Sequence, residues 1–381
     1  MGFQQAIVWV CLGLLAYVYA GYPLLVRLLA GRLRRRVAAA PHAPSVSVLI
    51  AAHNEAPHIV ATVRNKLAQD YPADRLEVIV VSDGSTDGTD DLVRGLDDRR
   101  VTLIRQEPRA GKTAGLNLAA PRARGDVLAF ADANSLWAPD ALARLVEPLA
   151  DPAVGYVTGR MAYRAPDGSL TGEGCSAYMR YENALRAWET ACGSIVGVDG
   201  GIDAVRRELY VPMRADQLPD FVLPLSVRER GFRVVYEPRA VLYEDALAAA
   251  GDEFRMRVRV SLRALHALRD KRALLDPRRY GLFAWQLWSH KVLRYLAPLF
   301  QVGALVANAV LGWGPWSFWK GLFAAQLLFY MLAWAGHLRR DEESPRLVTL
   351  AYYLCLVNAA AGVALWRVLR GERQVTWQPR T

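Results

Sequence analysis

Apolar residues are concentrated at the two ends of this chain, whereas the middle alternates short apolar runs with polar clusters. The first apolar stretch covers residues 3–29 and is interrupted only by Gln4, Gln5 and Arg27. As a helix it is long enough to cross a hydrocarbon core of roughly 30 Å. Because it lacks the basic start and small-residue cleavage site of a signal peptide, we predict a retained membrane anchor over residues 1–31.

Three more apolar stretches lie near the end of the chain, at about residues 292–313, 316–338 and 347–369. Each is close to the roughly 20 residues that a spanning helix needs. We therefore predict three transmembrane segments within residues 291–370, followed by a basic tail over 371–381. This pattern is typical of a multi-pass protein of the cell (inner) membrane.

Arginines flank these segments unevenly. Directly after the anchor stand Arg32, Arg34, Arg35 and Arg36. By the positive-inside rule this end of the anchor, and the middle block after it, face the cytoplasm. Four crossings would then put this end of the chain outside, although it carries Arg367, Arg370, Arg373 and Arg380, and the same rule disfavours that outcome. Either one stretch is re-entrant or interfacial, or the anchor overrules the tail, and the sequence leaves the choice open.

The middle block reads as alternating strands and helices. After a proline-containing breaker comes an apolar run of strand length, Val46–Ala52. A helix with Ile59, Val63 and Leu67 on one face follows, and a second strand at 76–81 completes a βαβ unit. The alternation continues with a helix at 87–96, a strand at 101–104, a helix at 113–120 and a strand at 127–130. We therefore predict an open, mainly parallel α/β sheet.

Aspartates follow two of these strands, Asp83 after the second and Asp132 after the last. Ligands bind at the carboxyl ends of the strands in open α/β sheets, so both side chains are candidates for one crevice. A nucleotide diphosphate would need a cation beside such acids, and oxygen ligands favour Mg²⁺ or Mn²⁺. The alternative for each aspartate is that it caps the next helix.

Composition narrows the partners. The formal net charge is +10, but the excess lies largely beside the apolar segments, where basic residues attract acidic lipid headgroups. We therefore predict contact with membrane lipids and no binding to nucleic acid. The four cysteines have no CxxC spacing, which argues against a disulfide framework or a zinc site. The apolar stretches also lack the acidic residues expected of an ion-coupled transporter.

Five short blocks now carry a resemblance. They are SVLIAAHNE at 47–55, VVSDGSTD at 80–87, GKTAGLN at 111–117, FADANS at 130–135 and LPDF at 218–221. In this order they resemble membrane-bound glycosyltransferases of family 2, which include the processive cellulose, hyaluronan and poly-N-acetylglucosamine synthases. The resemblance implies a cytosolic GT-A domain, a Rossmann-like nucleotide-sugar fold, over residues 42–250.

The resemblance also implies roles for single residues on the donor side. The positions that cradle the uracil and ribose of a UDP-sugar are Ala51, His53, Glu55 and Asp83. Ala51 stands where the family often has proline, and His53 where it often has tyrosine. His53 could stack on the base or make a hydrogen bond within the turn. Lys112 matches a lysine whose ammonium suits a phosphate.

The metal site departs from the family pattern. Asp132 matches the first acid of the DxD motif, but Asn134 replaces the second. Asparagine keeps a carbonyl oxygen and loses the charge, so we expect a weaker or more Mn²⁺-selective site for Mg²⁺ or Mn²⁺. Activity without a metal is the alternative.

Asp220 matches the acid of the family's acceptor-side motif, which implies that it is the catalytic base of an inverting transfer. The family often has a second acid just before it, where this chain has Pro219. A helix cap is the alternative role for Asp220. Upstream, Gly200 and Asp199 resemble a glycine-rich acceptor loop. Asp199 could bind acceptor hydroxyls or cap a helix through Val205 and Leu209, and the sequence slightly favours the cap.

An amphipathic segment follows over residues 251–290. The family's QxxRW element should lie here, but only an arginine, matched to Arg259, is present. Arg255, Arg259 and Arg263 recur every four residues and so share one helical face. This basic face could clamp a pyrophosphate or rest on acidic lipid.

The sequence thus predicts an enzyme that moves a sugar from a UDP-sugar to a growing polysaccharide or a lipid-linked acceptor. One alternative is transfer of a single sugar to a lipid. Another is a catalytically silent subunit that serves as a scaffold in a membrane complex. The motifs name neither the sugar nor any partner protein.

Overall fold

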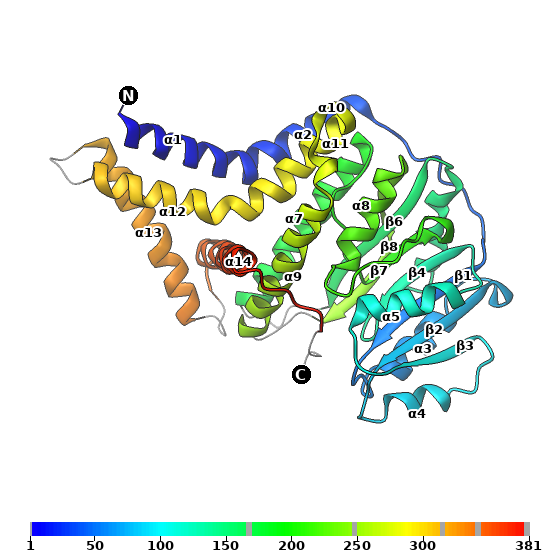
Figure 1. Cartoon of the computed structure of the whole chain (residues 1–381). Helices are drawn as coiled ribbons and strands as arrows, with labels where there is room; N and C mark the ends of the chain where they lie inside the picture. Colours follow the sequence, from blue (N-terminus) through cyan, green and yellow to red (C-terminus); the bar gives the residue numbers. More distant parts are fainter. Residues whose placement is uncertain (1, 165–169, 246–249, 313–316, 340–343, 377–381) are drawn as a thin grey trace.

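The chain combines a sheet domain with long apolar helices at both ends (Figure 1). This computed structural model describes residues 2–164, 170–245, 250–312, 317–339 and 344–376. Trp313 and Trp316, at the edges of predicted segments, and Arg380 of the tail lie outside these residues. The predicted arrangement, an α/β domain between terminal apolar helices, is confirmed.

One eight-stranded sheet organises the domain, in the order β3-β2-β1-β4-β7-β6-β8-β5. The pairs β1–β2, β1–β4, β2–β3 and β6–β8 are parallel, and β4–β7, β6–β7 and β5–β8 are antiparallel. The strands are β1 (Val46–Ala52), β2 (Leu76–Asp83), β3 (Val101–Gln106), β4 (Val127–Asp132), β5 (Leu136–Trp137), β6 (Val154–Arg164), β7 (Ile202–Arg206) and β8 (Arg233–Asp245). The sheet is therefore mixed and mainly parallel, as expected.

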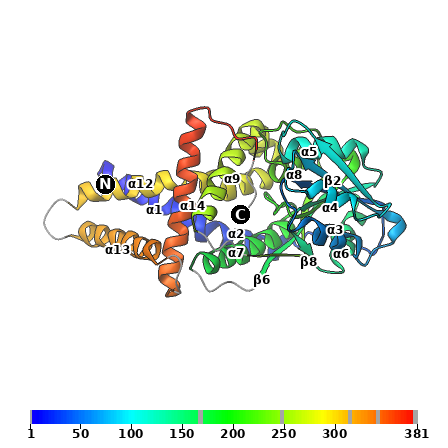
Figure 2. The same cartoon turned by 90° about the horizontal axis from the view of Figure 1, so that it is seen from below.

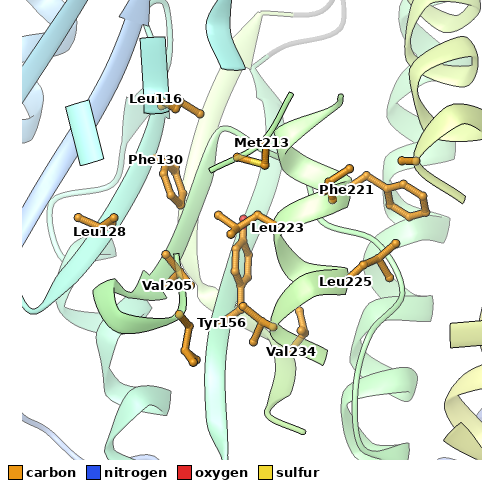
Figure 3. Packing of buried hydrophobic residues seen from close by; sticks show 14 of the residues in the cluster. Leu116, Leu128, Phe130, Tyr156, Val205, Met213, Phe221, Leu223, Leu225 and Val234 are labelled. Carbon is orange, nitrogen blue, oxygen red and sulfur yellow. The ribbon is translucent and has the colours of Figure 1, made fainter. Parts of the chain in front are cut away.

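Helices cover both faces of the sheet, because side chains along a buried strand point alternately to either side. On β1, Leu49 joins one apolar cluster while Val48 and Ile50 join the other. Figure 3 shows the first cluster, in which Phe130 and Tyr156 pack between the sheet and α8. The covering helices are α3 (Ile59–Leu67), α4 (Thr89–Arg94), α5 (Lys112–Ala119), α6 (Ala141–Val146), α7 (Leu170–Cys192) and α8 (Pro219–Glu229).

One sequence expectation about local structure is wrong. No helix follows Asp199 over the described residues 200–206, because Ile202–Arg206 forms strand β7. Val205 packs into one apolar cluster and Ile202 into the other, so the segment buries side chains on both faces of the sheet. Asp199 therefore does not cap a helix at this position.

Four helices are long and apolar enough to cross a membrane, over Phe3–Leu33, Leu282–Leu311, Phe318–Leu338 and Arg346–Leu369. The first joins α1 (Phe3–Ala16) to α2 (Tyr22–Leu33) through a π-helical turn. The second includes α11 (Leu282–Leu287) and α12 (Leu293–Leu311), and the last two are α13 and α14. They indicate a membrane protein.

These helices do not all run the same way. α1 and α12 lie side by side and extend away from the sheet domain. Figure 2 shows α14 running across them, next to α9 (Ala250–Asp270).

Candidate functional site

The predicted polar residues meet at the carboxyl ends of the central strands. Ala51 of β1 pairs with Val81 of β2 on one side and with Asp132 of β4 on the other. Asp83 ends β2 two residues later, so Asp83 and Asp132 flank the end of β1. This is the edge where open α/β sheets bind ligands.

Lys112 links the donor side of this edge to the predicted base. It begins α5, and its ammonium Nζ lies 2.7 Å from Asp132 Oδ1 and 3.6 Å from Asp220 Oδ1. Burial alone would lower the pKa of Lys112, but the charges of Asp132 and Asp220 outweigh it and leave the pKa raised. The lysine is therefore a fixed cation between two carboxylates.

Asp220 stands in the first turn of α8, whose N-cap residue is Leu218, so Asp220 is not the capping residue of this helix. Burial raises the pKa of Asp220, while the neighbouring Lys112 ammonium opposes the rise. A carboxylate with a raised pKa takes up a proton more readily than an ordinary one, which suits a general base.

The backbone of Gly200 lies directly against the side chain of Asp220. Its backbone has φ +87°, and a Cβ built on it would lie 2.3 Å from Asp220 Cγ. No side chain fits in that space, so the glycine lets the loop approach the carboxylate directly. Gly200 therefore sets the position of Asp220, which sequence reasoning did not anticipate.

We expect Gly200→Ala to lower sugar transfer by about a hundredfold, because the methyl group must displace the Asp220 carboxylate and misplacement of a catalytic group by about 1 Å is that costly. Gly231→Ala is the matched control, since Gly231 has φ +91° and open space around its Cβ position. Both substitutions place a side chain on a glycine with positive φ, so the backbone strain is similar. If the two variants have the same melting temperature, a difference between their transfer rates reports the displacement of Asp220. Equal rates for the two variants would contradict this role of Gly200.

Asp83 is buried and holds the loop that leads into α5. Its carboxylate accepts hydrogen bonds from the backbone N–H groups of Ala110, at 2.8 Å, and Gly111, at 3.0 Å. Gln106 Nε2 donates to it at 2.5 Å, and Arg109 Nε lies 3.5 Å away. Asp83 therefore shapes the loop before Lys112 and does not cap α4, which begins after Gly88. Its predicted contact with a base or ribose stays a prediction.

His53 and Glu55 lie in the turn after β1. His53 Nδ1 donates to the backbone carbonyl of Asp83 at 2.7 Å, so this nitrogen carries a proton. The backbone N–H of Glu55 donates to Thr89 Oγ1 at 3.0 Å. These bonds favour the turn-forming role that was one of the two alternatives for His53. Stacking on a base stays untested for His53, as does donor binding by Glu55.

The basic face predicted from Arg255, Arg259 and Arg263 lies on helix α9, and Arg263 points from it into the catalytic domain. Its guanidinium donates to Thr113 Oγ1 at 2.9 Å and also to the carbonyl of Gln217. Burial lowers the pKa of Arg263 to about 10, and the charge of Asp220 opposes the fall. Arg259 lies one turn earlier on the same helix. Arg263 therefore links α5 to the segment before Asp220. Phosphate binding by Arg259 stays a prediction.

Asp199 makes a buried ion pair. Two of its oxygens accept from Arg186 of α7, Oδ2 from Nη1 and Oδ1 from Nη2, both at 2.6 Å. A bidentate pair of this kind fixes geometry as well as charge. Asp199 thus anchors the loop that carries Gly200, and its predicted contact with acceptor hydroxyls stays a prediction.

Sequence reasoning missed Asp203, on β7 beside this site. It is 0% exposed, and the hydroxyl groups of Thr158 and Tyr156 lie against its carboxylate, where their hydrogen bonds partly compensate the burial. Burial raises the pKa of Asp203 to about 8, and the charge of Asp220 adds to the rise. A lone acid inside the apolar run Ile202–Val205 was the signal available in the sequence.

The raised pKa of Asp203 predicts a pH-dependent stability. The unfolded carboxyl loses its proton near pH 3.8, whereas the folded one keeps it until about pH 8. Between these values the unfolded state binds fewer protons, so the contribution of Asp203 to stability is greatest at low pH and falls as pH rises toward 8. We expect Asp203→Asn to remove this decline and to raise the melting temperature at pH 8 by about 5 °C.

Melting curves of the detergent-solubilised protein between pH 4 and 9 test this. Asp91→Asn is the control, because Asp91 is an exposed aspartate on α4 and its replacement should leave the decline in place. An unchanged slope for Asp203→Asn would contradict the assignment.

The predicted metal ligands fit a hard cation in part. Asp132 is 38% exposed and Asn134 lies in the turn directly after β4, so both can present oxygens to the site. Such oxygens suit Mg²⁺ or Mn²⁺. Within the described ranges no group of three or more His, Cys, Asp or Glu side chains is placed to hold a metal by itself. A cation here would therefore need oxygens from a bound diphosphate as well.

Known proteins resemble this chain in sequence. The family profile described as Glycosyl transferase family 2 matches residues 47–210. Poly-beta-1,6-N-acetyl-D-glucosamine synthase of Staphylococcus aureus is 26% identical over 266 residues, which cover 66% of this chain and 64% of that protein. The chain thus spans just under two thirds of the length of this curated relative.

A solved structure resembles the chain over nearly its whole length. It is the mannosyltransferase PcManGT from Pyrobaculum calidifontis in complex with GDP-Man and Mn²⁺. The two chains are 28% identical and superpose with a TM-score of 0.73, covering 94% of this chain and 99% of that one. The likeness therefore includes the terminal helices as well as the sheet domain.

Proposed function

The chain belongs to glycosyltransferase family 2, and we propose that it transfers a sugar from a nucleotide-sugar donor to an acceptor at a membrane surface. The observation that carries this proposal is the cluster of Lys112 between Asp132 and Asp220 at the carboxyl edge of the sheet. It joins a site for a diphosphate to a site for a base. A catalytically silent scaffold would have no need for this arrangement.

The donor lies along the edge formed by β1, β2 and β4. The Arg109–Gly111 loop, held by Asp83, and the turn at His53 and Glu55 border the nucleotide. Lys112 faces the diphosphate as a point charge and stabilises the negative charge that develops as the sugar leaves. Arg259, one turn from the braced Arg263, adds a second cation on the same side.

Asp132 and Asn134 would hold a Mg²⁺ or Mn²⁺ ion beside the diphosphate. A bound cation supplies positive charge for the departing phosphate oxygens. Mn²⁺ is present in the complex of the mannosyltransferase from Pyrobaculum calidifontis, which supports this choice of metal.

Asp220 accepts the proton of the acceptor hydroxyl. The acceptor oxygen forms its bond to the anomeric carbon as the bond from that carbon to the diphosphate breaks, so the configuration inverts. The raised pKa of Asp220 matches this task. The Gly200 loop, anchored through Asp199, lies against the Asp220 carboxylate and so holds the base on the acceptor side of the site.

For the substrates we favour a UDP-sugar donor and a glycan or lipid-linked acceptor, with the catalytic domain in the cytoplasm. The similarity to a poly-beta-1,6-N-acetyl-D-glucosamine synthase supports extension of a polysaccharide. A second candidate is transfer of a single mannose from GDP-mannose. It is favoured by the structural likeness to the mannosyltransferase, which extends over 94% of this chain.

Purified protein in lipid nanodiscs, supplied with Mn²⁺ and one donor at a time, tests the proposal. We expect nucleotide release and product from UDP-N-acetylglucosamine, with Asp220→Asn as the inactive control. Product from GDP-mannose alone would favour the second candidate, and the product size separates extension from single transfer. Nucleotide release by neither donor, or equal release by the control, would contradict the proposed function.

A further inference from the structure

The helix α14 is apolar enough to cross a membrane, yet its first half lies against the amphipathic helix α9 and against α7 of the sheet domain. The hydroxyl of Tyr353 donates to Glu253 Oε1 at 2.7 Å, and Arg257 Nη2 donates to the same hydroxyl at 2.9 Å. Both partners belong to α9. The Tyr353 ring also lies 5.9 Å from the ring of Tyr178 on α7. A charged pair on α9 thus meets α14 seven residues after its start.

The segment after α14 lies against the same domain. His266 Nε2 donates to the carbonyl of Glu372 at 2.8 Å, and Arg373 Nη1 donates to Asp216 Oδ2 at 2.7 Å. Further on, the carbonyl oxygen of Val375 would lie 2.8 Å from a Cβ built on Gly111, next to Lys112. Residues 372–375 therefore remain on the side of the catalytic domain.

The middle of α14 contacts the place where the first apolar helix joins the domain. Tyr19 donates to Asn358 Oδ1 at 2.7 Å, from the π-helical turn between α1 and α2. Beside it, the hydroxyl of Tyr17 lies 2.7 Å from Ser289 Oγ, and that of Tyr22 donates to Glu189 of α7. Aromatic side chains with polar tips are typical of the boundary between lipid and water. The middle of α14 is thus at the level of this boundary, while its first half and the segment after it contact the side of the catalytic domain.

The preceding helix, α13, returns to that boundary. Near its end, a Cβ on Gly336 would lie 2.7 Å from Tyr352 Cβ, and the ring of His337 is 6.2 Å from the Tyr352 ring. If α12 leaves the domain side and α13 returns to it, α14 begins on the domain side. A crossing by α14 would carry the tail to the far side, away from Asp216 and His266.

The surface of α14 matches a position within the plane of the membrane. In its most apolar window 50% of the residues are buried inside protein, against 11–22% for the other three helices. Its remaining face exposes large apolar side chains, while arginines stand at both ends. The exposed residues are Leu347, Leu350, Trp366 and Leu369, and the arginines are Arg346, Arg367 and Arg370.

We propose that α14 lies in the membrane surface on the side of the catalytic domain, with Leu347, Leu350, Trp366 and Leu369 in the lipid. Its arginines then meet the headgroups, acidic ones above all, as on other interfacial helices. Three helices cross the membrane, and the basic tail stays with the catalytic domain. This arrangement satisfies the positive-inside rule at both ends of the chain.

Single cysteines in a background without the four native cysteines test this arrangement. The sites are Gly2 before α1, Arg94 in the catalytic domain, Arg339 after α13 and Thr376 after α14, all exposed. Cells that express the full chain are treated with a membrane-impermeant maleimide before and after permeabilisation. We expect Gly2→Cys to react from outside, and Arg94→Cys, Arg339→Cys and Thr376→Cys to react at least tenfold more after permeabilisation.

Two results would overturn the proposal. Reaction of Thr376→Cys from outside, with Arg339→Cys protected, would mean that α14 crosses the membrane. Reaction of Arg339→Cys from outside, with Thr376→Cys protected, would mean that α14 makes the return crossing in place of α13. To check that the cysteine-free chain folds, the amount of it in the membrane is compared with that of the native sequence expressed under the same conditions.

Discussion

Replacing Asp220 by asparagine lowers sugar transfer by about a thousandfold, the middle of the range for loss of a general base. The amide keeps the shape of the side chain and its place above Gly200, but it cannot accept the acceptor's proton. Donor binding should not weaken, because loss of the Asp220 charge leaves the Lys112 ammonium, 3.6 Å away, more available to the diphosphate. The measurement is nucleotide release with and without acceptor, together with the affinity for the donor.

The matched control for Asp220 is Glu229→Gln, on the same helix. Glu229 pairs with Lys271 at 2.5 Å, away from the site, so its loss should leave the rate within about twofold. The pH profile gives a second test. Because burial raises the pKa of Asp220, the rate should begin to fall, as pH is lowered, at a higher pH than for an ordinary aspartate. A mutant that keeps the wild-type rate would rule out this base.

Replacing Asp132 by alanine lowers transfer by at least about a hundredfold, because it removes the only charged metal ligand in its block and the closer partner of Lys112. Asn134→Asp should keep the activity and tighten metal binding, since it restores a second acid. The two substitutions therefore act in opposite directions on the Mn²⁺ concentration that gives half-maximal rate.

Asp126→Asn is the control for Asp132, because Asp126 lies just before the other end of β4, where it accepts from Ser45 Oγ. Its replacement should leave the metal dependence unchanged. If Asp132→Ala and wild type showed the same Mn²⁺ titration and the same rate, the metal would be held elsewhere or not be needed.

The parts of the fold set by local patterns could be predicted from the sequence. Strand β1 was expected at Val46–Ala52 and lies there, because a run of this length that is apolar except for Ser47 suits a strand buried on both faces. Asp132 was likewise placed correctly, at the end of a strand that pairs with β1. Both predictions depend on apolar patterns and turn residues that lie within a few positions of each other in the sequence.

The parts set by contacts between distant segments could not be predicted. Gly200 and Asp220 are 20 residues apart, and only the folded chain shows that one lies beneath the other. Asp199 was expected to cap a following helix, since nothing in the sequence shows that it pairs with Arg186 on the preceding helix α7. The orientation of α14 in the membrane could not be predicted either, since a helix that crosses a bilayer and one that lies along its surface can have the same length and hydropathy.

The position of Lys112 has a kinetic consequence. Its ammonium compensates part of the charge of Asp220, and so holds that carboxylate's pKa below the value that burial alone would give. An arriving diphosphate attracts the same ammonium and leaves Asp220 with less compensation, hence more basic. We therefore expect an ordered reaction, in which the donor binds first and the acceptor meets a fully active base only after the donor is in place.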